Sequence, residues 1–258
     1  MVTLLYILFF TFVGSILSLI GGIILLSREK FAIKISHLLS SFAAGALLGT
    51  AFFDLLPEAF EHAEEEGIDV NIFAWTLGGI LIFFLLERFI HWFHHHHELA
   101  VAKDRSVVSL IVLGDGVHNF IDGVAIAASF MVSIPLGIVT SLAVAAHEIP
   151  QEIGDFGVLL HKGLSKFKVL YLNVLSALTA IFGAVITFGV GEQIHAFLPA
   201  LLAITAGFFI YIAASDLIPE IHNEEKRKVA LIETLLLLLG VATIYLTVSI
   251  LQSLALPH

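Results

Sequence analysis

HNFIDG (residues 118–123) and HEIPQE (residues 147–152) each place metal-ligating side chains inside a long apolar stretch of the chain. An ionisable side chain at the centre of a membrane-spanning helix costs roughly 2.5–3.5 kcal/mol on insertion scales, so it normally faces a partner or a cavity. The two stretches together carry Asp115, Asp122, Glu148, Glu152 and Asp155. We therefore expect a cation to sit between them.

The composition is that of a helical membrane protein. Of the 258 residues, 59% are hydrophobic and 13% are charged, and the mean hydropathy is +1.01. Apolar runs of about twenty residues recur, which is the length that an α-helix needs to cross a bilayer. The runs are continuous and do not alternate, which excludes a porin-like barrel. The absence of cysteine excludes disulfides and thiolate metal chemistry.

The apolar runs predict eight membrane-spanning helices that form a single transmembrane domain over residues 1–258. These spans are Val2–Leu26, Ile35–Phe60, Ile72–His91, Ser106–Val132, Pro135–His161, Lys168–Gly191, Phe197–His222 and Val229–Leu256. No basic segment precedes the first run, so we expect this run to remain as a span and not to be removed as a signal peptide. The predicted fold class is an all-α membrane protein with short loops.

The twelve Lys and Arg residues all fall near one face of the predicted membrane. They flank the loops between spans one and two, three and four, five and six, and seven and eight. Because basic loops stay in the cytoplasm, both termini should be extracytoplasmic. The opposite side carries an acidic segment that would raise the local cation concentration, or would be a plain solvated loop. Its residues are Glu58, Glu61, His62, Glu64, Glu65 and Glu66.

A short pattern recurs in the second and seventh spans. Ala44-Gly45 is followed nine residues later by DLLPE (54–58), and Ala206-Gly207 is followed nine residues later by DLIPE (216–220). The two spans run in opposite directions, and an inverted repeat is typical of secondary transporters with a site near the midplane. We expect helices 1–3 and 6–8 to be the repeats. Their acids should line the path: Asp54 and Glu58 near the outer mouth, Asp216 and Glu220 near the inner one.

Residues three, four and seven apart share one face of a helix, so each central span presents one polar stripe. The stripes are Asp115, His118, Asn119 and Asp122, and His147, Glu148, Gln151, Glu152 and Asp155. Imidazole nitrogen with carboxylate and amide oxygens suits Zn²⁺ first, with Fe²⁺, Mn²⁺ and Cd²⁺ next. The alternative is that these side chains only join helices, at about 0.6 kcal/mol each. Even in a metal site, individual members such as Asp115 or Asp155 would only orient their neighbours.

The two central motifs resemble the fourth- and fifth-helix signature of the ZIP (zinc/iron-regulated transporter-like) metal transporters. The branch that they resemble most reads H-E-x-P-H-E followed by G-D-F, and this chain continues with Gly154-Asp155-Phe156. The resemblance implies a 3+2+3 bundle with inverted halves and no enzymatic activity. It also implies zinc uptake toward the cytosol by an elevator-like motion.

The same resemblance implies a ligand set, which is His118, Asn119, Asp122, His147, Glu148 and Gln151, with Glu152 as a supporting ligand. Some members of the family bind two metals side by side, using a further acid from the sixth helix. This chain has Gln at position 151 and no acid in its sixth span, Lys168–Gly191. We therefore expect one well-formed site that binds Zn²⁺ as substrate.

A His-rich loop is predicted on the cytoplasmic side, over residues 91–105. Its imidazoles would collect emerging metal, or would belong to a solvated loop with incidental metal affinity. They are His91, His94, His95, His96 and His97. Three further imidazoles, those of His37, His161 and His195, fit residues at the membrane interface better than ligands.

Two other functions remain open at this stage. An intramembrane zinc metalloprotease would use H-E-x-x-H, but Gln151 stands where the second His is due. An efflux carrier would use the same site, because ligands do not encode direction. The expected partners are the metal ion and the lipid bilayer, without nucleic acid, and a homodimer is left open. The compact chain favours the plasma membrane of a prokaryote.

Overall fold

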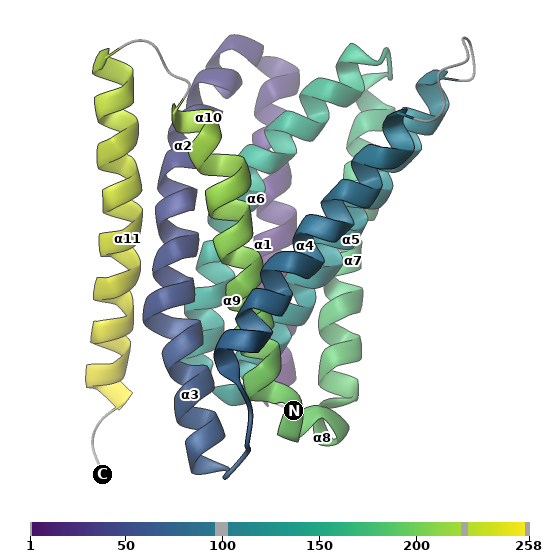
Figure 1. Cartoon of the computed structure of the whole chain (residues 1–258). Helices are drawn as coiled ribbons and strands as arrows, with labels where there is room; N and C mark the ends of the chain where they lie inside the picture. Colours follow the sequence, from purple (N-terminus) through teal and green to yellow (C-terminus); the bar gives the residue numbers. More distant parts are fainter. Residues whose placement is uncertain (1, 96–102, 223–226, 256–258) are drawn as a thin grey trace.

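The computed structural model describes residues 2–95, 103–222 and 227–255, and this part of the chain is helical with no strand. The helices run roughly parallel to one another between two ends of the molecule (Figure 1). They are α1 (Val2–Ser27), α2 (Glu29–Thr50), α3 (Leu56–Glu65), α4 (Ile72–His95), α5 (Lys103–Val132), α6 (Ile134–His161), α7 (Lys166–Gly189), α8 (Gly191–Ile194), α9 (Leu198–Tyr211), α10 (Ile218–His222) and α11 (Arg227–Ala255). The predicted all-α class is confirmed.

Seven stretches of the described chain are long and apolar enough to cross a membrane. They are Val2–Ser27, Glu29–Glu65, Ile72–Phe89, Ile111–Val132, Lys166–Gly189, His195–Leu217 and Lys228–Leu251. The remaining long helix, α6, does not reach the same apolarity because five polar side chains interrupt its second half. These are His147, Glu148, Gln151, Glu152 and Asp155.

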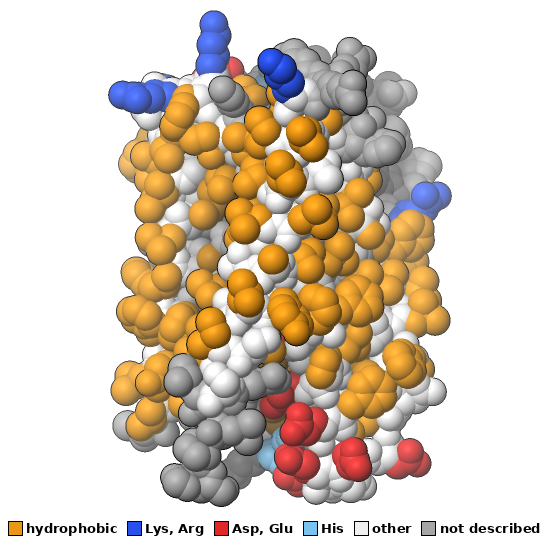
Figure 2. Space-filling model, turned by 90° about the vertical axis from the view of Figure 1, so that its left-hand side faces the viewer, with side chains coloured by type: hydrophobic (Ala, Val, Ile, Leu, Met, Phe, Trp, Pro, Cys, Tyr) orange, Lys and Arg blue, Asp and Glu red, His pale blue; other side chains and the backbone are white. Residues whose placement is uncertain are grey.

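On the face of the molecule that Figure 2 shows, apolar side chains form a belt between two charged ends. Large side chains such as Phe12, Leu85 and Phe182 are exposed there, at 52%, 49% and 62%. An apolar surface of this extent belongs in lipid. We call the two ends the basic end (Arg28, Lys30, Lys162, Lys166 and Lys168) and the acidic end (Glu58, Glu61, Glu64, Glu65, Glu66 and Asp69). Helix α1 starts, and α11 finishes, at the acidic end (Figure 1).

We divide the helices into two groups, the site bundle (α1, α5, α6 and α7) and the flanking bundle (α2, α3, α4, α9 and α11); the two groups meet chiefly where α2 packs against α6. Glycine brings helices within each bundle into backbone contact. A Cβ atom on Gly183 of α7 would lie 2.3 Å from the carbonyl oxygen of Phe120 in α5. In the flanking bundle, a Cβ on Gly45 of α2 would lie 1.9 Å from the carbonyl oxygen of Leu237 in α11. Such close approaches are typical of helix pairs in membranes.

The two D-x-x-P-E motifs share an unusual local structure. A π-helical segment, Ala51–Leu55 or Ile212–Leu217, comes just before Pro57 or Pro219. Proline lacks the N–H that would bond the carbonyl four residues earlier, so a regular α-helix is interrupted there. A π-helical turn keeps the chain helical across the interruption, and such turns are frequent at functional sites. The sequence predicted the motif but not this turn.

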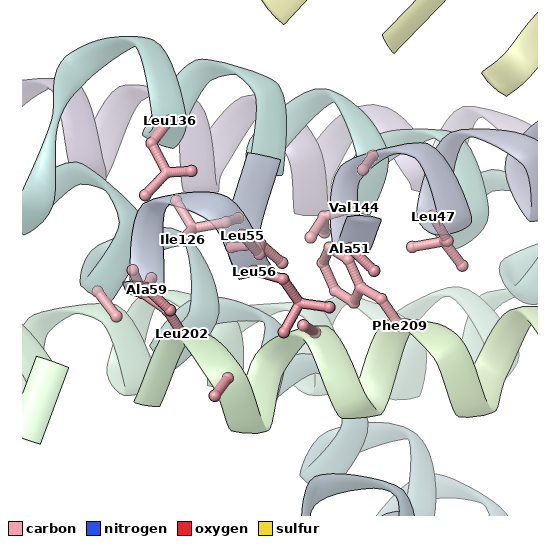
Figure 3. Close-up of a cluster of buried hydrophobic side chains, with 14 of the residues drawn as sticks. Leu47, Ala51, Leu55, Leu56, Ala59, Ile126, Leu136, Val144, Leu202 and Phe209 are labelled. Carbon is pink, nitrogen blue, oxygen red and sulfur yellow. The ribbon is translucent and has the colours of Figure 1, made fainter. Parts of the chain in front are cut away.

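A cluster of apolar side chains fills the interior between the level of residue 122 and the acidic end (Figure 3). Leu55 follows α2, Ile126 comes one turn after Asp122 in α5, and Val144 comes one turn before His147 in α6. Leu202 and Phe209 of α9 complete the cluster from the other side. These side chains are nearly fully buried, so the interior is closed on the acidic side.

Candidate metal site

Helices α5 and α6 bring four ligand-type side chains together halfway along their lengths. His118 and Asp122 lie one turn apart in α5, and His147 and Glu148 are neighbours in α6. Asp122, His147 and Glu148 are only 3%, 1% and 1% exposed. Within the described part of the chain, this is the one group of at least three His, Asp or Glu side chains that is close enough to hold a metal ion.

The separations within this group are those of a tetrahedral ligand set. His118 Nε2 lies 3.1 Å from His147 Nε2, 3.7 Å from Asp122 Oδ2 and 3.6 Å from Glu148 Oε1. His147 Nε2 lies 3.2 Å from Asp122 Oδ2 and 3.9 Å from Glu148 Oε1. Ligands about 2.0–2.1 Å from a tetrahedral Zn²⁺ are about 3.4 Å apart. The five separations given above lie within about 0.5 Å of that value. The four ligand atoms all lie within 4.8 Å of one another, so the group could hold such an ion once its atoms drew together.

A backbone carbonyl fixes the orientation of His147. Its Nδ1 lies 3.1 Å from the carbonyl oxygen of Ala143, one turn earlier in α6. Because a carbonyl only accepts, Nδ1 carries the proton and donates, which leaves the lone pair of Nε2 facing the group. This is the usual support of a metal-bound histidine.

Buried carboxylate oxygens around the group lack protein partners. Neither oxygen of Glu148 or of Glu152 has a hydrogen-bond partner among the described residues. Glu152 is 0% exposed and lies one turn after Glu148. Burying an anionic group without compensation is expensive. A divalent cation supplies that compensation for Glu148 directly, whereas Glu152 lies outside the four-residue group.

The other candidate ligands occupy the neighbouring turns. The Asn119 side-chain nitrogen donates to Asp115 twice, to Oδ1 at 2.9 Å and to the backbone oxygen at 3.2 Å. This pair holds Asn119 in place, so its amide nitrogen is already used. Gln151 and Asp155 lie one and two turns beyond His147 and line a cavity beside the site.

That cavity leads from the site toward the basic end. It has a volume of about 510 Å³ and begins at His118 and His147. Beyond them it is lined by Asp115, Gln151, Asp155, Glu87 and Asp216, among others. Asp216 is exposed, so the cavity extends to an accessible side chain. Together with the apolar cluster on the opposite side, this arrangement gives the site access from the basic end.

The structure adds three side chains that the sequence did not single out. Phe83 packs its ring edge-on against His118, with centroids 5.6 Å apart. Tyr211 of α9 donates a hydrogen bond to the carboxylate of Glu87 in α4, beside the cavity. Glu87 is an acid inside an apolar run, so the cost of burying charge in a membrane was a signal that could have found it. The aromatic residues gave no comparable signal.

Of the candidate residues outside the central site, the structure describes the side chains of only some. Asp54 is 8% exposed, and its Oδ2 has no hydrogen-bond partner within the described ranges. Glu58 is half-buried one turn further along α3, whereas His37, His161 and His195 are exposed. The side chains of Glu220, His91, His94 and His95 are outside the description, as are residues 96–102 with His96 and His97.

The family model and the related proteins named below are all described as zinc transporters. The sequence model of the family described as ZIP Zinc transporter matches residues 2–108 and 94–247. The chain is 34% identical to zinc transporter ZIP4 of Mus musculus over 78% of this chain and 41% of that protein. It is 33% identical to zinc transporter ZIP13 of Pongo abelii, over 86% and 69% of the two chains.

A third relative, the zinc transporter ZIP13 homolog of Drosophila melanogaster, is 28% identical over 90% of this chain and 86% of its own. The chain spans only 41% of the length of mouse ZIP4. It is 44% identical to zinc transporter ZIP10 of Danio rerio over 50% of this chain, which corresponds to 15% of that relative. The family model covers both central motifs, at residues 118–123 and 147–152, whereas the chain spans only part of the length of these longer relatives.

Proposed function

The chain belongs to the ZIP zinc transporter family, and on that premise we propose that it carries Zn²⁺ across a membrane through the site between α5 and α6. One observation carries the proposal. Four ligand atoms, from half-buried His118 and from buried Asp122, His147 and Glu148, lie within 4.8 Å of one another in the middle of the bundle. A cation bound there is surrounded by protein halfway through the apolar belt.

Transport requires access from each side in turn, and the packing supports an elevator-like motion. In this conformation the site is reached from the basic end, and the apolar cluster closes the acidic side. All four ligands belong to the site bundle, so that bundle can carry the ion without releasing it. The glycine contacts stiffen each bundle internally, which favours movement of one bundle against the other.

We propose the orientation and path that the charges favour. The basic end would face the cytoplasm and both termini the other side, with α6 as the eighth span. Asp54 and Glu58 would receive the ion at the acidic end, and Asp216 and Glu220 would release it at the basic end. The matching π-helical segments at the two D-x-x-P-E motifs support the inverted repeat of helices 1–3 and 6–8. Direction toward the cytosol follows the resemblance.

We also propose roles for the residues around the four central ligands. Asn119, Gln151 and Glu152 would complete or support the coordination, and Asp115 and Asp155 would orient the ligands. Fe²⁺, Mn²⁺ and Cd²⁺ suit the same donors and are proposed as further substrates. Metal collection by the His-rich loop and a homodimer remain predictions. So does the membrane of origin: the compact chain favours a prokaryotic plasma membrane, whereas the relatives named above are eukaryotic.

Zinc flux into proteoliposomes tests the proposal. Asp122→Ala and His147→Ala should each abolish zinc uptake, because each removes one of four ligands. His161→Ala, which removes an exposed imidazole at the basic end, should transport like the wild type. Thermal unfolding in detergent would show that all three variants are folded. Undiminished flux in both ligand variants would contradict the proposal, and a reversed zinc gradient would separate uptake from efflux.

A further inference from the structure

A second pair of imidazoles lies at the acidic end, away from the central site. His62 belongs to α3, and His195 begins the short turn His195–Phe197 that precedes α9. Their ring centroids are 5.6 Å apart, and the ring planes make an angle of 60°. The two imidazoles of the central site, His118 and His147, are 5.3 Å apart at 62°. The outer pair therefore has a ring spacing and ring angle close to those of the central pair.

This arrangement suits a shared metal ion. Two imidazoles bound to one tetrahedral Zn²⁺, with each nitrogen about 2.0–2.1 Å from the ion, have ring centroids about 5 Å apart. A plain ring contact has a similar spacing, so the spacing alone does not decide. The second observation is that His62 Nε2 is buried and has no hydrogen-bond partner among the residues that the structure describes. Leaving such an atom unpaired costs about 1–3 kcal/mol, and a bound cation would remove that cost.

The surroundings of the pair favour a cation and lead inward. Glu58 lies one turn before His62 on the same face of α3, and Asp54 lies one turn before Glu58. The three side chains form a row. The row runs along α3 by about 6 Å from His62 to Glu58, and Asp54 continues it from within the π-helical segment Ala51–Leu55. At its inner end, the buried Oδ2 of Asp54 is also without a hydrogen-bond partner in the described part. Figure 2 shows an imidazole among the acidic side chains at this end.

We propose that His62 and His195 form a capture site for a hydrated divalent transition-metal ion of the zinc class. The site takes the ion at the acidic end and passes it along Glu58 to Asp54. Two imidazoles with water bind such an ion more weakly than the four ligands of the central site, which lets it move on. This inference rests on the proposed function, since a capture site serves a carrier that takes metal from this side.

A binding measurement tests the site without any transport. The background is the full chain in detergent with Asp122→Ala and His147→Ala, and with the five loop imidazoles replaced by Asn. Equilibrium dialysis with radioactive zinc should find one remaining site. His195→Ala in this background should weaken it by at least the roughly tenfold loss that follows removal of even an outer-shell partner of a metal ligand. His161→Ala, another exposed imidazole, should leave it unchanged.

The proposal is overturned if the background binds no zinc, or if His195→Ala binds it as tightly as the background does. His62→Ala should reproduce the loss, and the exposed His195 keeps the test valid if His62→Ala fails to fold. In the otherwise wild-type chain, His195→Ala should raise the KM of zinc uptake without changing the maximal rate. If the wild type moved no zinc, the proposed function would fail, and the binding measurement would still decide on the capture site.

Discussion

Gln151 separates this site from the H-E-x-P-H-E pattern that its fifth-helix motif otherwise resembles. Its side chain lines the cavity between the central ligands and the basic end, together with Asp115 and Asp155. An amide is a poorer zinc ligand than an imidazole. The two neighbouring carboxylates would nevertheless be in place for a second ion if position 151 offered a ring nitrogen.

We therefore expect Gln151→His to add a second zinc ion per chain beside the first. The gain would be measured as zinc stoichiometry of the purified protein, with the loop imidazoles replaced in both the variant and its parent. Gln151→Asn, which keeps an amide, serves as the control and should not change the stoichiometry. An unchanged value in Gln151→His would show that Asp115 and Asp155 are not available to a metal.

At this scale the sequence predicted which side chains lie close together around His118 and His147, for a simple reason. Spacings of three and four residues place side chains on one helix face, whatever the rest of the fold does. The contacts that each side chain makes could not be predicted, because they depend on its rotamer and on the neighbouring helices. Thus the sequence placed Asn119 among the ligands, and only the structure shows that its nitrogen bonds to Asp115.

Helix α7 contributes no member of the four-residue group, yet its packing positions α5. Gly183 lets the two backbones touch, because a Cβ there would lie 2.3 Å from the carbonyl oxygen of Phe120. Gly189, at the end of the same helix, has open space where its Cβ would be. Gly189 can therefore serve as a control for Gly183, because both glycines lie in α7 and only Gly183 touches another helix.

Gly183→Ala should lower the free energy of unfolding by about 1–3 kcal/mol, because the added methyl group overfills the contact. It should also weaken zinc uptake, since α5 must shift away from α7. Gly189→Ala should be neutral or should stabilise by up to about 1 kcal/mol, as alanine usually does within a helix. Thermal unfolding in detergent measures both, and equal effects would contradict the role given to the contact.

Among the elements, length and apolarity located most of the long helices to within a few residues, including α6 with its polar second half. The second span was predicted too short, because its helical stretch begins at Glu29 and continues to Glu65. The π-helical segments escaped prediction. A proline in an apolar run predicts an interruption, but whether the helix kinks, ends or widens by one residue is decided by the helices around it. The close glycine contacts could not be predicted either, because the sequence does not show which helix lies opposite each glycine.

The whole molecule is asymmetric in access, although the D-x-x-P-E motif occurs in both halves of its sequence. The cavity lies on the basic side of the central site, and the apolar cluster of Figure 3 lies on the acidic side. No sequence pattern could predict this, because a carrier must pack the same residues in two ways. The structure describes one of them.

The chain has no cysteine, so single cysteines can report this asymmetry. Gly154→Cys lines the cavity from an exposed position, whereas Ala127→Cys lies in the apolar cluster at 0% exposure. A charged maleimide should label Gly154→Cys faster, by at least about tenfold, since each 1.4 kcal/mol needed to open a buried position costs that factor. Equal rates would contradict the closed acidic side.

The placement of all four ligands in one bundle has a thermodynamic consequence. In the transport motion proposed above, an ion would meet the same four atoms whichever face of the membrane it came from, so the same ligands would set its intrinsic dissociation constant for both faces. Such a site would not by itself favour one direction of ion flow over the other. Net flow then reverses when the concentrations or the voltage across the bilayer reverse, and any uphill accumulation has to draw on a second gradient.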